Sequence, residues 1–511
     1  MKRILSILLT LAFLLLLTAC AVAKSAAVNT VNAGSSDIKE TNAPLPTDNA
    51  AEKETNAPAQ TLEPTPVPTE APTEAPTPEP TPMPQREDDG LVTPDVIAGD
   101  DVFFIVYPDG SLCGWGNNEY GQLGIGSNKS KTKPVHIADG LVPVSVGDTV
   151  YALDSENTLW GWGRNDSAQL ATGDTKNRNK PVEILKNVVS VTKTLFTCYA
   201  LTEDGGLYNW SWYPGDTSLS KAEMESLSVP RLVYENVRQF ESYMLVTNDG
   251  ELMYNDYHTG WVKRADNVKR IIDTLGKELY EDNDGRLWIL YGAESELITD
   301  SFREAYRADY NVYVLKDDGS LFEYNRENGL VFIMNEVVEF TADGMMDEDW
   351  GYDIKFALKA NGELYSWGSF SNAALGKAYD DYDYSPVLVA ENVKDFVSNG
   401  AQTYIIKTDG SVWATGMGTS ERILRGCVGD GTDETRYGFV DTHLTGIVKI
   451  ATHLQYDIID EGDGTDSCLL TTRTYAVAAD GSVFAWGYNG DGFLGTGSAD
   501  ALVLSPEAVS R

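Results

Sequence analysis

A glycine-rich phrase returns along this chain, and its repetition constrains the fold more than any other feature. The fullest copy, residues 109–126, holds an Asp-Gly pair, an aliphatic residue, a Trp-Gly pair and four further glycines. Residues 480–497 repeat this order almost letter for letter, and weaker copies begin at Asn157, Asn361 and Asp409. A unit that recurs at intervals of about 20–50 residues is typical of repeat architectures, in which each unit is one small block of secondary structure.

The turn at the start of the phrase recurs more often than the phrase itself. Asp-Gly between two apolar runs is a strong hairpin signal, and a type I′ turn would need positive φ at both central residues. We therefore expect nine hairpins. They are centred on Asp109-Gly110, Glu156-Asn157, Asp204-Gly205, Asp249-Gly250, Asp284-Gly285, Asp318-Gly319, Asn361-Gly362, Asp409-Gly410 and Asp480-Gly481.

The runs around each turn predict strands that are buried on both faces. Residues 103–106 precede the first turn, and Val412-Trp413 follows a later one. A further run of the form Val-x-x-aliphatic, such as residues 188–191, precedes most hairpins, and prolines such as Pro134 mark a fourth, outer strand. Four short strands per unit, with aromatic and glycine marks and no substantial helix, predict an all-β chain folded as a β-propeller.

The complete phrase resembles the regulator of chromosome condensation repeat family. The best copies are residues 109–126, 157–173 and 480–497, and the pattern is weakest between residues 206 and 340. The resemblance implies a β-propeller, usually of seven blades. The nine hairpins leave two alternatives open: two units are not full blades, or the ring is larger. We expect the glycines to allow sharp turns, and Asn117 and Asn489 to cap the loops.

The N-terminus has the layout of a secretory signal. Lys2 and Arg3 precede an apolar run, which ends in Leu17-Thr18-Ala19-Cys20. This resembles the bacterial lipoprotein signal, and the resemblance implies that Cys20 is lipidated and anchors the protein on the extracytoplasmic side of the cell membrane. An ordinary signal peptide or a transmembrane anchor remains the alternative, although the apolar run is short for a span of about 20 residues.

Composition divides the rest of the chain into two parts. Residues 21–89 are rich in Pro, Thr, Glu and Ala and lack aromatic residues, so we expect a disordered linker that acts as a stalk. Residues 90–511 form the predicted propeller. The net charge of the chain is −38, and residues 21–100 hold 14 acidic against 4 basic residues, so most of the negative charge belongs to the propeller. We expect no nucleic-acid partner, since such a partner would require an extensive basic surface and the propeller is acidic overall.

Three groups of residues are candidates for binding or cross-linking. Tyrosine offers contact area at a low entropic cost, so an acidic tyrosine-rich stretch is the first candidate for a protein partner. Carboxylates between glycines in the interval 416–474 are weak candidates for calcium, and on the alternative interpretation this interval is a solvated insertion on the propeller rim. Two cysteines flank its irregular part and are a possible disulfide pair. The respective residues are Tyr379, Asp380, Asp381, Tyr382, Asp383 and Tyr384; Asp460, Asp463 and Asp466; and Cys427 and Cys468.

Aromatic residues near the third turn offer a further candidate. Trp210, Trp212 and Tyr213 either line a groove for sugar or pack between blades. We identify no catalytic residues and expect no cofactor.

The combined features favour a non-enzymatic, lipid-anchored platform that binds a protein at the cell surface. The alternatives are binding or hydrolysis of a surface glycan and, from the family resemblance alone, guanine-nucleotide exchange. Hydrolysis would require two carboxylates at glycosidase spacing, one of them with a raised pKa.

Overall fold

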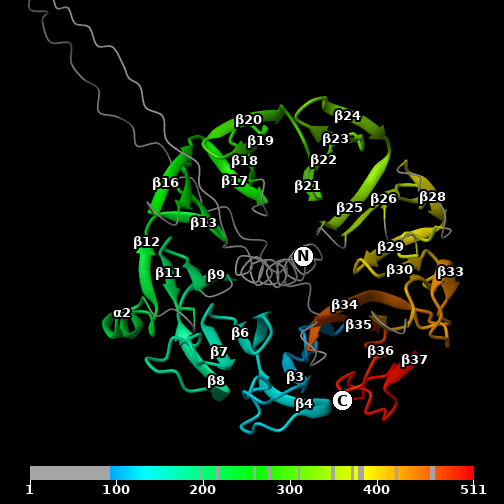
Figure 1. Cartoon of the computed structure of the whole chain (residues 1–511), viewed down its shortest axis with the longest axis horizontal. Helices are drawn as coiled ribbons and strands as arrows, with labels where there is room; N and C mark the ends of the chain where they lie inside the picture. Colours follow the sequence, from blue (N-terminus) through cyan, green and yellow to red (C-terminus); the bar gives the residue numbers. More distant parts are fainter. Residues whose placement is uncertain are drawn as a thin grey trace, which may run out of the picture. The chain divides into compact units, whose positions relative to one another are not determined.

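The computed structural model describes residues 93–510, apart from 195–196, 214–217, 257–259, 274–277, 309–310, 347–350, 370–372, 378–384, 420–423 and 461–465. Within these ranges the chain forms nine sheets, each with four main antiparallel strands, and the sheets follow one another around a ring (Figure 1). We number them blade 1 to blade 9 in chain order. The predicted β-propeller is therefore confirmed, and of the two alternatives the larger ring is correct.

Each blade takes its four main strands from one continuous stretch of sequence. Blades 1 to 3 consist of β1 (Asp95–Ala98), β2 (Val102–Val106), β3 (Ser111–Gly116) and β4 (Lys131–Asp139); β5 (Val142–Ser145), β6 (Thr149–Leu153), β7 (Leu159–Gly163) and β8 (Arg178–Leu185); and β9 (Val188–Lys193), β10 (Cys198–Thr202), β11 (Leu207–Trp210) and β12 (Arg231–Tyr234). The short helix α2 (Lys221–Ser226) lies between β11 and β12.

Blades 4 to 6 repeat the pattern through the region where the sequence phrase is weakest. They consist of β13 (Val237–Glu241), β14 (Met244–Thr247), β15 (Leu252–Asp256) and β16 (Gly260–Ala265); β17 (Val268–Asp273), β18 (Glu278–Asp282), β19 (Leu287–Tyr291) and β20 (Glu294–Thr299); and β21 (Glu304–Ala308), β22 (Asn311–Leu315), β23 (Leu321–Asn325) and β24 (Gly329–Met334).

Blades 7 to 9 complete the ring. They consist of β25 (Val337–Met346), β26 (Gly351–Lys359), β27 (Leu364–Ser369) and β28 (Val387–Ala390); β29 (Val393–Ser398), β30 (Gln402–Lys407), β31 (Val412–Gly416) and β33 (Arg436–Asp441); and β34 (Ile447–Asp460), β35 (Asp466–Ala478), β36 (Val483–Tyr488) and β37 (Leu502–Ala508). The two-residue β32 (Leu424–Arg425) leaves blade 8 and pairs in parallel with β35 of blade 9.

The interval 416–474 is more regular than expected. It contains β33, the outer strand of blade 8, and most of the β34–β35 hairpin, which pairs from Ile447 with Ala478 to Asp460 with Asp466. The interpretation as an insertion on the rim is therefore wrong, because the extra residues lengthen the first two strands of blade 9.

The apolar core lies between neighbouring blades. Every residue of β2 is buried. Phe103 and Ile105 belong to the cluster shared with blade 9, whereas Phe104 and Val106 belong to the cluster shared with blade 2. Alternate side chains of a strand point to opposite faces of the sheet, so a strand packed on both sides must be apolar at every position. This confirms the expectation from the apolar runs.

The Asp-Gly turns differ from the expected type. At Asp109-Gly110 only the glycine has positive φ, at +82°. The Gly110 amide donates to the Tyr107 carbonyl at 2.9 Å, and the Asp109 carboxylate accepts from the Ser111 amide at 3.0 Å. This is a type I turn followed by a left-handed glycine, and Pro108 suits its second position. The turns were located correctly, but type I′ was wrong because the aspartate caps its own turn.

The ring closes by packing between the first and last blades, without exchange of a strand. The indole of Trp115 in blade 1 lies 5.9 Å from the ring of Tyr475 in blade 9. The buried Arg473 of β35 donates to the Asp100 carbonyl of blade 1 at 3.2 Å and to the Asp491 carboxylate at 2.8 Å. Aromatic contacts and a buried charge-assisted bond thus replace the hydrogen bonds that a shared strand would supply.

Candidate binding surface

The connections of each blade alternate between two ends of the sheet because its strands are antiparallel. The connections between first and second strands therefore share one face with those between third and fourth strands, and the Asp-Gly hairpins lie on the other. We call the first of these the loop face. The Trp-Gly phrase ends the third strand and forms the longer connections of this face.

The glycine of the Trp-Gly pair allows two connections of one blade to touch. Gly116 has φ +109°, and a Cβ there would overlap the carbonyl oxygen of Asp101. The next amide, that of Asn117, donates to the same oxygen at 2.7 Å. Gly163 and Gly487 repeat this close approach in blades 2 and 9. The glycines therefore have the structural task that the sequence predicts.

A buried asparagine two residues after that glycine holds each long loop together. The carboxamide of Asn118 accepts from the Leu123 amide at 2.9 Å and donates to the Ser127 and Lys129 carbonyls. Asn165 and Asn489 make the equivalent bonds in blades 2 and 9. The prediction for Asn489 is thus confirmed. In blade 1 this position belongs to Asn118, whereas Asn117 makes only a local bond to the Glu119 amide.

A cavity of about 260 Å³ lies on the loop face between blades 2 and 3. Arg164 crosses it, held by the carboxylates of Asp148 at 3.2 Å and Asp166 at 2.7 Å. Trp212 and Tyr213 line the blade 3 side, and the Tyr213 residue is 50% exposed. The cavity therefore combines a cation, carboxylates and accessible aromatic surface. We call it the loop-face cavity.

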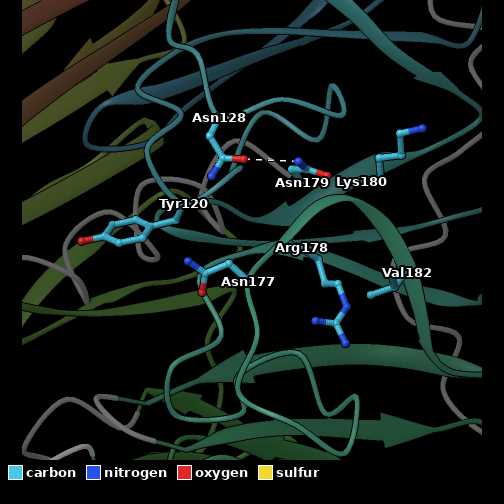
Figure 2. Close-up of a pocket in the computed structure, with 7 residues that line it drawn as sticks. All are labelled: Tyr120, Asn128, Asn177, Arg178, Asn179, Lys180 and Val182. Carbon is cyan, nitrogen blue, oxygen red and sulfur yellow. Dashed lines mark hydrogen bonds between the residues drawn. The ribbon is translucent and has the colours of Figure 1, made fainter.

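A second, shallower groove of about 190 Å³ adjoins it between blades 1 and 2. Figure 2 shows Asn128 of the blade 1 loop directed toward Asn179 of β8, whereas the ring of Tyr120, from the same loop, points away from the other labelled residues. The Arg164 guanidinium lies over the ring of Tyr120 at 5.0 Å, so one side chain connects this groove with the loop-face cavity. We call the second site the rim groove.

Arg164 and the two carboxylates in the loop-face cavity neutralise one another, which does not favour acid–base chemistry. Burial alone would raise the pKa of Asp166, but bonds from Arg164 and Gln169 outweigh it and lower the pKa. Burial raises the pKa of the Cys198 thiol, which lies 2.9 Å from the Tyr151 hydroxyl, so the thiol stays protonated at neutral pH. Within the described ranges, every carboxyl group with a resolved shift has a lowered pKa.

Of the aromatic residues near the third turn, one packs between blades and two line a cavity. Trp210 is buried, and its indole donates to the Gln169 carbonyl of blade 2 at 2.7 Å, so it packs between blades. Trp212 and Tyr213 line the cavity. Sequence reasoning missed Tyr120 and Arg164, which belong to different repeats and meet only because the loops of neighbouring blades lie side by side.

Several predicted site residues fall outside what the structure describes. Residues 379–384, Cys20 and Asp463 lie outside the described residues, as do the side chains of Asp460, Asp466 and Cys468. Cys427 is a free buried thiol whose sulfur lies 3.1 Å from the Val503 carbonyl, so the proposed disulfide with Cys468 has no support in the structure.

Residues 93–510, with the gaps given above, contain no group of three His, Cys, Asp or Glu side chains placed to hold a metal ion. No helix in the same ranges has both the length and the apolar character needed to cross a membrane.

Comparison with known proteins gives two kinds of similarity. Residues 109–150 and 156–193 match the Regulator of chromosome condensation (RCC1) repeat. The chain is 28% identical over 158 residues to the E3 ubiquitin-protein ligase HERC2 of Homo sapiens and 29% identical over 157 residues to that of Mus musculus. Each match covers 29% of this chain and 3% of the ligase, so the chain spans a small part of these relatives.

Two solved structures resemble this chain over most of its length, at low sequence identity. Prp20p from Saccharomyces cerevisiae is 15% identical with a TM-score of 0.40, covering 83% of this chain and 89% of that one. Human WBSCR16 is 13% identical with a TM-score of 0.38, covering 81% and 94%.

Proposed function

We propose that this chain, a nine-bladed propeller of the RCC1-repeat type, is a lipid-anchored platform that binds a protein partner at the cell surface. The loop face over blades 1 to 3 makes the contact. The central element of this surface is Arg164, stacked on Tyr120 and held by two carboxylates. No catalytic step is part of the proposal.

The arrangement of this surface supports binding without large rearrangement. Buried asparagines and interblade tryptophans hold the long loops of blades 1 and 2 in one conformation. Little conformational entropy is therefore lost when a partner binds to these loops. Arg, Tyr and Trp are the residue types enriched among interface hot spots. Here Arg164 lies over Tyr120 of the neighbouring blade and lines the same cavity as Tyr213.

The location rests on the N-terminal sequence. Lys2, Arg3 and the run that ends in Cys20 support export and lipidation, and residues 21–89 supply a Pro-rich stalk between anchor and propeller. A partner would then be another component of the cell envelope or its surroundings.

Capture by the full-length protein tests the proposal. The chain, purified in detergent, is used as bait for envelope and secreted proteins at low and moderate salt, and Arg164→Ala serves as the matched negative. One saturable protein that survives moderate salt and is lost with Arg164→Ala would support the proposal. Capture of basic proteins alone, removed by salt, would contradict it, because exposed charge pairs are screened.

A further inference from the structure

Two short stretches of this acidic chain are purely basic. Residues 127–136 contain three lysines and residues 175–182 contain two lysines and an arginine, with no acidic residue in either, although the chain has 77 acidic and 39 basic residues. The stretches lead into and begin β4 and β8, the outer strands of blades 1 and 2. Two neighbouring outer strands therefore share a concentration of positive charge.

These lysines have no ion-pair partner among the described residues, whereas the nearby Asp174 and Glu183 each have one. Asp174 pairs with Arg178 at 3.1 Å, Asp139 with His136 at 2.8 Å and Glu183 with Lys186 at 3.8 Å. The unpaired lysines are Lys129, Lys131, Lys133, Lys176 and Lys180. Their charge is thus available to a ligand.

Protection of sheet edges does not explain the clustering. Lysines on an edge strand discourage pairing with other chains, and such a role would apply to every blade. The outer strands of blades 5, 6, 7 and 9, which are β20, β24, β28 and β37, contain neither lysine nor arginine. Blade 4 carries Lys263 on its outer strand β16, but that lysine pairs with Glu251 and Asp266. The run of unpaired lysines is therefore found on blades 1 and 2 and is not a general feature of the blade edges.

Two of the lysines lie across blade junctions. The stem of Lys180 packs on Gly126, where an added Cβ would be 2.8 Å from Cε, and the stem of Lys133 packs on Gly497 of the blade 9 loop in the same way. A lysine whose methylenes lie along a surface keeps its ammonium group at the edge of that surface. The charges of Lys133 and Lys180 are thereby placed at two consecutive junctions.

The rim groove beside Lys180 is polar. Three carboxamides line it, and two of them, Asn128 and Asn179, are hydrogen-bonded to each other at 3.2 Å (Figure 2). Apart from Tyr120, the only apolar side chain in its lining is Val182. Protein interfaces usually have an apolar or aromatic core, whereas carboxamides donate and accept hydrogen bonds as sugar hydroxyls require.

We propose that the rim groove and its lysines bind an anionic polysaccharide, a sugar chain that carries carboxylate or phosphate groups. The acidic groups pair with Lys180 in the groove and with Lys133 at the preceding blade junction, and the hydroxyls bond to the carboxamides of the groove. This goes beyond the protein-binding function, because the ligand is a glycan and the site is the rim groove rather than the loop-face cavity.

The test measures binding by the full-length protein in detergent. The probes are oligogalacturonate for carboxylate, phosphomannan for phosphate, methyl-esterified oligogalacturonate as the neutral sugar, and poly-L-glutamate as an anion without sugar. The proposal predicts binding of one or both anionic glycans, little binding of the neutral ester or the polypeptide, and an affinity that falls with added salt. Binding of both anionic glycans would show that the site accepts carboxylate and phosphate alike. Binding of only one would show which of the two acidic groups the site recognises.

Variants locate the site. The double variant Lys133→Gln/Lys180→Gln is expected to weaken glycan binding about fivefold, since exposed charge pairs each contribute modestly. Lys180→Arg, which keeps the charge, and Lys263→Gln/Lys316→Gln, on blades 4 and 6, are expected to bind as the parent does. Unchanged circular dichroism would confirm folding. No binding of either anionic glycan, equal binding of poly-L-glutamate, or full binding by the double variant would overturn the proposal.

Discussion

The indole nitrogen of Trp115 donates a hydrogen bond of 3.0 Å to the carbonyl oxygen of Phe493, although the two residues are 378 positions apart. Trp162 makes the same bond to Gln122 at 2.8 Å, across the junction between blades 1 and 2. The contact that closes the ring is therefore the one that joins consecutive blades. Glycine permits it, because a Cβ at Gly495 or Gly124 would crowd the indole.

The equivalence of these two contacts predicts equal effects of their removal. Trp115→Phe and Trp162→Phe should each lower the free energy of unfolding by about 1–3 kcal/mol, because a buried carbonyl loses its donor. The urea midpoints of the two variants measure this. If Trp115→Phe left the midpoint unchanged while Trp162→Phe lowered it, closure would not depend on the tryptophan.

The two kinds of positive-φ glycine should differ in their tolerance of alanine. Gly140→Ala, at φ +76° with open space around it, is expected to cost about 1–2 kcal/mol from the backbone alone. Gly116→Ala should cost clearly more, because its Cβ would also overlap the Asp101 carbonyl. Thermal unfolding of both variants is the measurement, and equal losses would show that the close approach is not needed.

Glu281 should make stability depend on pH. Its nearly buried carboxylate bonds to Lys269 at 2.7 Å and Arg270 at 2.5 Å. Burial raises its pKa, but these bonds outweigh burial and lower it. A lowered folded pKa stabilises the fold above the unfolded pKa of about 4.3, and this stabilisation is lost as pH falls through the folded value.

The variant Glu281→Gln should therefore lose about 1–3 kcal/mol at neutral pH and little at pH values below the folded pKa. Glu251→Gln removes an exposed pair with Lys263 and is the control, expected to cost no more than about 1 kcal/mol. Urea midpoints across pH compare the two. A deficit of Glu281→Gln that persists unchanged in acid would exclude the ion pairs as its cause.

Cys20→Ala tests the anchor. The variant should lose labelling by radioactive palmitate and leave the membrane fraction, because a lipid-linked cysteine would be the protein's attachment. Ser6→Ala, a change in the signal outside the Leu17–Cys20 motif, serves as a comparison for effects on export. A Cys20→Ala protein that remained labelled and bound to membranes would contradict lipidation at this residue.

Local patterns in the sequence were enough to predict the blades. Asp109-Gly110 and its counterparts fix the hairpins through a short-range turn, and the doubly apolar runs reveal packing on both faces. Nine hairpins could therefore be counted from the sequence, but the tertiary structure was needed to show that each belongs to a full blade. The Trp-Gly pair is missing from blades 3 to 6 and from blade 8, yet these blades form, because the Asp-Gly turn and the apolar strands of each suffice.

The candidate surface was less predictable because it depends on contacts between repeats. Trp210 and Trp212 are two residues apart, yet one is a buried interblade donor and the other lines a cavity. Arg164 and Tyr120 lie in different loops, and no local pattern indicates that they stack. The β34–β35 hairpin was missed for another reason: its acidic, glycine-containing tip masked the regular pairing of the strands around it.

The affinity of a captured partner for the parent protein and for two matched arginine variants tests the central claim most directly. Arg326 in blade 6 also pairs with a carboxylate, Glu296 at 3.1 Å, and lies over a tyrosine, Tyr291 at 4.7 Å, but on a distant blade. The account predicts that Arg164→Ala weakens binding about tenfold or more, as hot-spot truncations do, while Arg326→Ala leaves it unchanged. Equal affinities for all three proteins would show that the loop face over blades 1 to 3 is not the binding surface.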